Sequence, residues 1–226
     1  MIYRDRREAG SVLASKLLKF KDRPDLIVLA LPRGGVPVAY EVATALNAPL
    51  DIFLVRKLGV PGHEELAMGA IATGGVRVLN HEVVDYLGIP DSVIDAITDD
   101  ELRELRRRER AYRGDRREPD VKGKTVILVD DGLATGSTIR AAAQALRQQG
   151  PAKIVVAVPV SAPQTCNEYE IGVDEIVCAV TPEPFLGVGR WYDDFSQTTD
   201  EEVHGLLERV RAVETAKQSR GVAHSH

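Results

Sequence analysis

The chain has 226 residues, of which 44% are hydrophobic, so it is long enough for one α/β domain with a full core. Its formal net charge of −5 argues against a general nucleic-acid binder, although a local basic patch stays open. Since no run of about 18 apolar residues and no signal peptide is present, we expect a cytoplasmic protein without a membrane span. The two cysteines, Cys166 and Cys178, are too few for a disulfide framework or a zinc site, and Cys178 is expected to be simply buried.

The N-terminal segment predicts an amphipathic helix. Asp5 can cap this helix, and apolar residues then recur at helical spacing to about Phe20. Its three arginines, Arg4, Arg6 and Arg7, are expected to be solvated rather than functional. We therefore assign this helix no part in a site.

A cationic, glycine-rich turn follows the first predicted strand. Residues 26–31 form a continuous apolar run, which is typical of a parallel strand covered on both faces, and residues 38–46 predict a helix. Between them, Gly34 and Gly35 allow the backbone to approach a ligand closely, and Arg33 offers a planar donor group to phosphate oxygens. The turn is a candidate anion site; the alternative is a tight turn with a surface arginine.

A further strand and a glycine-rich hairpin come next. Residues 50–55 predict a strand, and Arg56 and Lys57 at its C-terminal end would point into the crevice beyond the sheet, or else pair with carboxylates. Residues 59–80 contain two short predicted strands joined by a Gly-Gly turn, beside a loop that we expect to be mobile.

Residues 90–112 predict a long helix, capped by Asp91, that leads into a dense run of arginines. Eight arginines lie within residues 103–117, near five acidic residues of the same helix. Our preferred interpretation is a solvated face on which the opposite charges balance. A nucleic-acid patch or an oligomer interface is the alternative, but no aromatic residues interleave as a single-strand stacking surface would need.

The motif VILVDDGLATGST, residues 126–138, gives the clearest indication of chemistry. An apolar strand ends in Asp130 and Asp131, and a loop of small residues then leads into a helix at residues 139–149. The loop consists of Ala134, Thr135, Gly136, Ser137 and Thr138. Such a loop offers a phosphate backbone N–H groups, hydroxyl donors and the positive end of a helix dipole. Because carboxylates can hold hydroxyls or a hydrated metal ion, the motif predicts a sugar-phosphate site.

The remaining elements complete an α/β fold. Two more apolar strands, at residues 153–160 and 175–180, are separated by a short helix at residues 164–169. Together with the earlier strand–helix units, they predict an open, mostly parallel twisted sheet with helices on both faces.

The segment 181–199 is distinguished by its aromatic residues. It holds four of the eleven aromatics of the chain: Phe185, Trp191, Tyr192 and Phe195. Together with nearby carboxylates and an amide, they suit the binding of a flat base, and core packing is the alternative. A final helix is expected from residue 200 to about 213, and residues 216–226 are expected to form a flexible tail.

The motif at residues 126–138 resembles the 5-phosphoribosyl 1-diphosphate (PRPP) binding motif of the type I phosphoribosyltransferases. The loop LPRGGVPVA, residues 31–39, is similar to that of bacterial phosphoribosyltransferase-domain proteins. The resemblance covers most of the chain, from about Tyr3 to Val213. It implies one phosphoribosyltransferase domain at residues 1–215, with a flexible lid at about 59–80 and a small hood that includes 181–199.

The resemblance also implies roles for individual residues. Asp130 and Asp131 would be the catalytic acids that contact the ribose hydroxyls, and the loop at residues 134–138 would wrap the 5-phosphate. Mg²⁺ would be held mainly by PRPP, with help from the same two acids. The other expected substrate-binding residues are Arg33, Gly34, Gly35, Arg56 and Lys57 near the pyrophosphate, where the turn often has an unusual peptide geometry, and Tyr192 in the hood.

The predicted reaction is transfer of the phosphoribosyl group from PRPP to a nucleobase-like acceptor, with release of pyrophosphate. The usual base-recognition signatures of base-salvage enzymes are missing, so the acceptor stays open. One alternative is a PRPP-sensing regulator that binds nucleic acid through its arginine-rich helix, and another is a hydrolase in which water replaces the base. We expect small-molecule partners and no membrane, and self-association into a homo-oligomer is left open.

Overall fold

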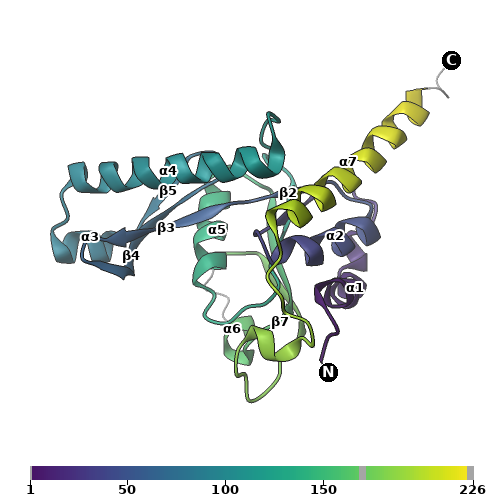
Figure 1. The fold of residues 1–226 in the computed structure, drawn as a ribbon, viewed down its shortest axis with the longest axis horizontal. Coiled ribbons are helices and arrows are strands. Elements are labelled where there is room, and N and C mark those ends of the chain that lie inside the picture. Colours follow the sequence, from purple (N-terminus) through teal and green to yellow (C-terminus); the bar gives the residue numbers. More distant parts are fainter. Residues whose placement is uncertain (1, 168–171, 223–226) are drawn as a thin grey trace.

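A parallel sheet of five strands forms the core of the computed structural model, which describes residues 2–167 and 172–222 (Figure 1). The strand order is β2-β1-β6-β7-β8, and every neighbouring pair is parallel. The strands are β1 (Leu26–Ala30), β2 (Leu50–Ile52), β6 (Thr125–Val129), β7 (Lys153–Val160) and β8 (Glu175–Val180). The predicted α/β class is confirmed.

Helices cover both faces of this sheet because its strands are apolar on both sides. Along β1, Val28 and Ala30 belong to one core cluster, and Leu29 belongs to the other. The first cluster includes residues of α1 (Arg6–Lys16), α2 (Gly35–Leu46) and α7 (Asp200–Val222), and the second includes residues of α5 (Ser137–Gln148). Three short helical elements lie between the larger ones: η1 (Leu18–Phe20), α6 (Pro163–Asn167) and η3 (Val188–Trp191). None of the helices in the described part of the chain has the length and apolar character that crossing a membrane requires.

The strand order places a topological switch point between β1 and β6, and a ligand crevice is expected there. After β1 the chain passes through α2 to β2 on one side, and after β6 it passes through α5 to β7 on the other side. Two neighbouring strands whose connections leave in opposite directions open a gap beyond their carboxyl ends, which is where ligands bind in open α/β sheets. The turn after β1 and the acidic motif after β6 therefore meet at this point.

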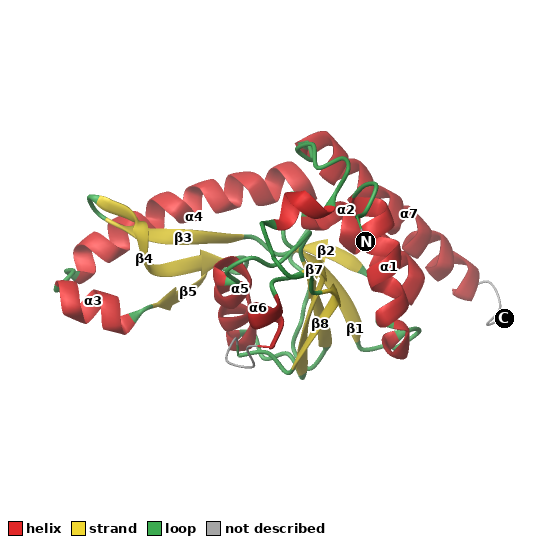
Figure 2. Cartoon of the chain, turned by 90° about the horizontal axis from the view of Figure 1, so that it is seen from below, coloured by secondary structure: helices red, strands yellow, loops and turns green. Residues whose placement is uncertain are grey.

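A second, antiparallel sheet forms an arm that projects from the core (Figure 2). It has the order β3-β4-β5 and is accompanied by two helices. The elements are β3 (Val55–Val60), β4 (His63–Ala72), β5 (Val76–Leu79), α3 (His81–Leu87) and α4 (Asp91–Arg113). The predicted hairpin is confirmed, since Gly74 and Gly75 have positive φ of 86° and 69° between β4 and β5. The segment expected to be a loop beside it instead makes a turn at Gly62 and enters β4 at His63.

Several predicted boundaries differ from the structure. The strand expected at residues 50–55 ends at Ile52, so Arg56 and Lys57 lie within β3 of the arm and not at the edge of the core sheet. Asp91 does not cap α4, because it is the first residue of that helix and follows Pro90. The unpredicted α3 has a side-chain cap, Asn80, and α7 continues to Val222. The predicted helix at 164–169 extends beyond the described residues; within them α6 ends at Asn167.

Most of the described arginines of residues 103–117 behave as predicted, but Arg113 is buried. Arg103, Arg107 and Arg108 pair with Asp100 or Glu104 on the same exposed face of α4. The Arg113 side chain is only 2% exposed and donates to Asp51 Oδ1 at 2.9 Å and to the carbonyl oxygen of Ile52 at 2.7 Å. It therefore joins the end of α4 to β2, which ties the arm to the core.

Arg113→Met is expected to lower the free energy of unfolding by about 3 kcal/mol, because removing one partner leaves the buried Asp51 carboxylate without its ion pair. Denaturant unfolding measures this. Arg116→Met is the matched control, since Arg116 is 48% exposed and pairs with Glu208 at the surface, where the expected cost is below about 1 kcal/mol. Equal losses in the two variants would contradict the assignment.

Candidate active site

Two loops touch at the crevice between β1 and β6. A Cβ atom added to Gly34 would lie 2.0 Å from Oδ2 of Asp131, and one added to Gly35 would lie 2.7 Å from the carbonyl oxygen of Val129. No side chain fits in either place, so glycine is required for the approach. The sequence-based pairing of this turn with the acidic motif is confirmed as a spatial arrangement.

Arg33 lies at the rim of the crevice. The peptide bond between Pro32 and Arg33 is cis, in line with the unusual geometry that the resemblance implies for this turn. The Arg33 Nη1 atom is 3.5 Å from Oδ1 of Asp200, and the Tyr112 hydroxyl donates to the same oxygen at 2.8 Å. Burial and this hydrogen bond to Asp200 raise the pKa of Tyr112 to about 12, so the phenol stays a donor. The Arg33 side chain is about one-third exposed, at 36%, and accessible to a ligand.

The two acids are adjacent, and both are partly shielded from solvent. Asp130 Oδ1 accepts a hydrogen bond from the backbone N–H of Asp131 at 2.8 Å. Burial raises the pKa of Asp130, and the neighbouring charge of Asp131 raises it further. Burial also raises the pKa of Asp131, against the opposing effect of Arg6. Ionisation of both carboxyls is therefore unfavourable until cations or hydroxyl donors approach them.

Arg6 is a site residue that the sequence-based prediction missed. Its Nε donates to Asp131 Oδ2 at 2.9 Å, and its side chain is 11% exposed, which contradicts the expectation that it is solvated. Arg4 and Arg7 are exposed as expected. A signal was present, because Arg6 precedes the buried Ala9 and Leu13 by three and seven residues and so shares their face of α1.

Tyr192 supports the acidic motif through the backbone of Asp131. Its hydroxyl donates to the backbone carbonyl of Asp131 at 2.6 Å, and its ring is 6% exposed between Tyr3 and Phe195. Burial raises the pKa of Tyr192, which keeps the hydroxyl protonated as a donor. The structure thus places Tyr192 in the packing beneath the site, whereas Phe195 is 37% exposed.

The loop at residues 134–138 presents hydroxyl groups at the start of α5. Gly136 precedes this helix with a positive φ of 74°, and Thr135 and Thr138 are exposed. A helix start with exposed hydroxyls is suited to an anion. The arrangement matches the predicted phosphate loop in position.

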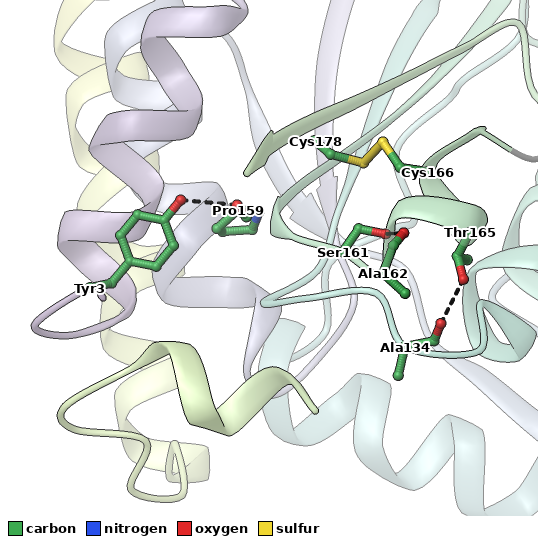
Figure 3. The surroundings of a disulfide bond; sticks show 8 residues. All are labelled: Tyr3, Ala134, Pro159, Ser161, Ala162, Thr165, Cys166 and Cys178. Atoms are coloured by element: carbon green, nitrogen blue, oxygen red, sulfur yellow. Dashed lines mark hydrogen bonds between the residues drawn. A yellow bond between two sulfur atoms is a disulfide. The ribbon is translucent and has the colours of Figure 1, made fainter. Parts of the chain in front are cut away.

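The loop at residues 134–138 is braced by the segment after β7 (Figure 3). Thr165 donates to the carbonyl oxygen of Ala134 at 2.8 Å. The next residue, Cys166, forms a disulfide with Cys178, which fixes α6 to β8. The expectation that Cys178 is merely a buried free thiol is wrong, because the turn after β7 returns Cys166 to the side of β8.

A groove of about 710 Å³ separates the loop at residues 134–138 from the arm. Thr135 and Ser137 line it on one side, and Asn80 and His81 line it on the other. The end of the predicted lid segment therefore borders the loop. Movement of this segment stays a prediction.

The structure does not bring Arg56 and Lys57 to the crevice. Arg56 is ion-paired with Glu101 of α4, and Lys57 Nζ donates to the carbonyl oxygen of Glu65 at 3.3 Å. Both line a separate hollow between the arm sheet and α4. Their predicted position near a pyrophosphate rested on a strand that ends earlier than expected.

Asp130 and Asp131 could hold a magnesium ion only together with groups of a bound ligand. The described residues contain no group of three or more His, Cys, Asp or Glu side chains that could hold a metal ion. Asp130 and Asp131 supply two carboxylates, and Mg²⁺ is commonly held by one or two carboxylates together with substrate phosphates and water. The donor set therefore fits an ion that arrives with an anionic substrate.

The open α/β sheet thus carries an acidic pair, a glycine turn and a hydroxyl-rich loop at its switch point, which is where proteins of this class bind their ligands. Residues 7–185 match the model of the phosphoribosyl transferase domain, and the chain belongs to this family. A candidate phosphoribosyl transferase of Mycobacterium tuberculosis, Rv0571c, is 45% identical over 209 residues, which is 92% of this chain and 47% of that protein. The chain thus spans about half the length of this relative.

Two further similarities concern a solved structure and a shorter match. The crystal structure of TT1426 from Thermus thermophilus is 42% identical, with a TM-score of 0.81 over 92% of this chain and 98% of TT1426. The bifunctional protein PyrR of Listeria monocytogenes is 38% identical over 107 residues, which is 43% of this chain and 58% of PyrR. The similarity to TT1426 extends the family assignment to the arrangement of the whole fold.

Asp130→Asn is expected to raise the midpoint of thermal unfolding at pH 7.5 by about 2–4 °C, which corresponds to about 1 kcal/mol in a domain of this size. The amide removes a buried charge, and its oxygen can still accept from the Asp131 N–H. Because folding raises the pKa of Asp130, the stability of the unaltered protein falls as the pH rises from the ordinary pKa of an aspartate towards the raised value, and it levels off above that value. The gain should therefore shrink as the pH is lowered towards about 4, near the ordinary pKa of an aspartate, and a gain that does not change with pH would contradict this explanation.

Proposed function

We propose that this chain is a phosphoribosyltransferase that binds PRPP and transfers its phosphoribosyl group to a nucleobase-like acceptor, with release of pyrophosphate. The observation that supports this most strongly is the contact of the Gly34–Gly35 turn with Asp130 and Asp131 at the switch point of the sheet. One ligand that carries a diol, a phosphate and a diphosphate would use all three parts of the crevice at once.

Each part has a role in this proposal. Asp130 and Asp131 accept hydrogen bonds from the ribose hydroxyls and favour the positive charge that develops on the ring. The loop at residues 134–138 binds the 5-phosphate with backbone N–H groups and hydroxyls. Arg33 and the backbone at Gly34 and Gly35 bind the departing pyrophosphate. A bound Mg²⁺ would neutralise charge on the diphosphate.

The pairing of Arg33 with Asp200 is compatible with this role. Both side chains are substantially exposed, at 36% and 55%, and exposed ion pairs of this kind contribute little to stability. A diphosphate can therefore replace Asp200 as the partner of Arg33 at small cost. No covalent intermediate with the protein is needed, because positioning and electrostatics carry the reaction.

The acceptor site is proposed to lie beside the segment 181–199. Phe195 is a partly exposed aromatic ring close to the acids, since it packs on Tyr192, whose hydroxyl holds Asp131. A flat heterocycle could pack against the exposed edge of this ring, since Arg6 lies over its face. Tyr192 would act through the backbone of Asp131 and not by touching the acceptor.

The alternative functions receive less support from the structure. Five arginines of residues 103–117 are ion-paired within the described chain: Arg103, Arg107, Arg108, Arg113 and Arg116. This reduces the charge that a nucleic acid could use. A hydrolase would use the same crevice, so pyrophosphate release from PRPP with and without a panel of bases, followed by mass spectrometry of the products, separates it from a transferase.

The double variant Asp130→Asn, Asp131→Asn is expected to lose PRPP turnover by more than about 100-fold, because its amides bind ribose hydroxyls and Mg²⁺ less strongly than carboxylates. Pyrophosphate release measures turnover, and circular dichroism checks the fold. Turnover near that of the unaltered protein would refute the assigned role.

Arg33→Ala is expected to weaken binding of PRPP about tenfold or more, while leaving binding of ribose 5-phosphate within about twofold, since only PRPP carries the diphosphate. Calorimetry on both ligands measures the difference. Arg116→Ala serves as the control, because Arg116 pairs with Glu208 away from the crevice. An equal loss for both ligands would move Arg33 away from the diphosphate.

A further inference from the structure

The Arg6 guanidinium connects the acidic motif to the C-terminal aromatic segment. Its Nε donates to Asp131 Oδ2 at 2.9 Å, and its Nη1 donates to the carbonyl oxygen of Ser196 at 2.7 Å. Its Cζ atom lies 4.0 Å from the centre of the Phe195 ring. Three partners from two distant parts of the chain thus fix the orientation of one planar group.

The backbone that carries Arg6 is itself held firmly against the site. A Cβ added to Gly10 would lie 2.7 Å from the carbonyl oxygen of Val38, so α1 packs closely against α2, the helix that begins in the crevice. On the other side of Arg6, the Tyr3 N–H donates to the Trp191 carbonyl at 2.8 Å, and the Asp193 N–H donates to the Tyr3 carbonyl at 2.8 Å. Arg6 is therefore placed by its fold and not only by its ion pair.

Asp131 has little freedom between its two neighbours. Its Oδ2 atom lies where a side chain on Gly34 would be, and the same oxygen accepts the hydrogen bond from Arg6. A carboxylate clamped through one oxygen presents the second in a defined direction, and the positive charge offsets its repulsion with Asp130.

We propose that Arg6 is a positioning residue, which orients the Asp131 carboxylate for the sugar hydroxyls and links that orientation to the aromatic segment 181–199. The inference rests on the proposed function, because it assumes that Asp131 binds the ribose. It adds a determinant from the N-terminal helix, a part of the chain to which the sequence assigned no role.

The test compares Arg6→Gln, Arg6→Lys and the matched control Arg7→Gln. Arg7 is the next residue of the same helix and is exposed. Arg6→Gln is expected to weaken ribose 5-phosphate binding about tenfold or more and to lower kcat with PRPP, because the charged hydrogen bond to Asp131 is lost. Arg6→Lys, which keeps the charge without the planar fork, should recover part of the binding, and Arg7→Gln should stay within about twofold of the unaltered protein.

A double-mutant comparison separates positioning from a general structural effect. If Arg6 acts through Asp131, adding Arg6→Gln to Asp131→Asn should weaken ribose 5-phosphate binding by less than about threefold beyond Asp131→Asn alone. The inference is overturned if the loss of ribose 5-phosphate binding in the double variant equals the product of the losses in the two single variants. It is also overturned if Arg6→Gln binds ribose 5-phosphate and turns over PRPP like the unaltered protein. If Arg6→Gln does not fold, the same comparison is made with Arg6→Lys.

Failure of the proposed function has a different signature. In that case the unaltered protein itself binds neither ribose 5-phosphate nor PRPP, and Arg7→Gln behaves in the same way. Binding by the unaltered protein and by Arg7→Gln, without any loss in the Arg6 variants, overturns the role of Arg6 alone.

Discussion

The close approach of two loops beyond β1 and β6 is the constraint on which the site depends. Gly34 and Gly35 carry no side chain because Asp131, Asp130 and the end of β6 occupy that space. The approach follows from the strand order, since β1 and β6 are neighbours whose connections leave towards opposite sides of the sheet. Packing of apolar strands thereby determines where an acidic pair and a glycine turn meet.

This arrangement has an electrostatic consequence. Two adjacent carboxyls that are mostly buried are costly to ionise together, and the protein offsets that cost at Asp131 through Arg6. A ligand that brings hydroxyl donors or a cation would offset this cost further. If the charges of a site are poorly compensated when it is empty and well compensated when a ligand is bound, the site binds that ligand more strongly. The uncompensated charges also lower the stability of the free protein.

Much of the core, and the loops that follow β1 and β6, could be predicted from the sequence, because their signals are local. The strands β1, β6, β7 and β8 are continuous apolar runs, and the loops that follow β1 and β6 carry distinctive residue types. Interactions between distant segments could not be predicted in the same way. Arg6 and Asp131 are 125 residues apart, and Cys166 and Cys178 are joined across a sequence separation of 12 that no local pattern relates.

The predicted positions of Arg56 and Lys57 were wrong because the end of β2 could not be located from the sequence. Only Phe53 and Leu54 separate β2 from β3, and both are buried, so the apolar run conceals the point at which the chain leaves the core sheet for the arm. Arg56 and Lys57 consequently belong to the arm, and the guanidinium that pairs with the acids is that of Arg6, while Arg33 pairs with Asp200. The positive charge beside the acids is therefore supplied by α1, which packs closely against α2, the helix that begins in the turn after β1.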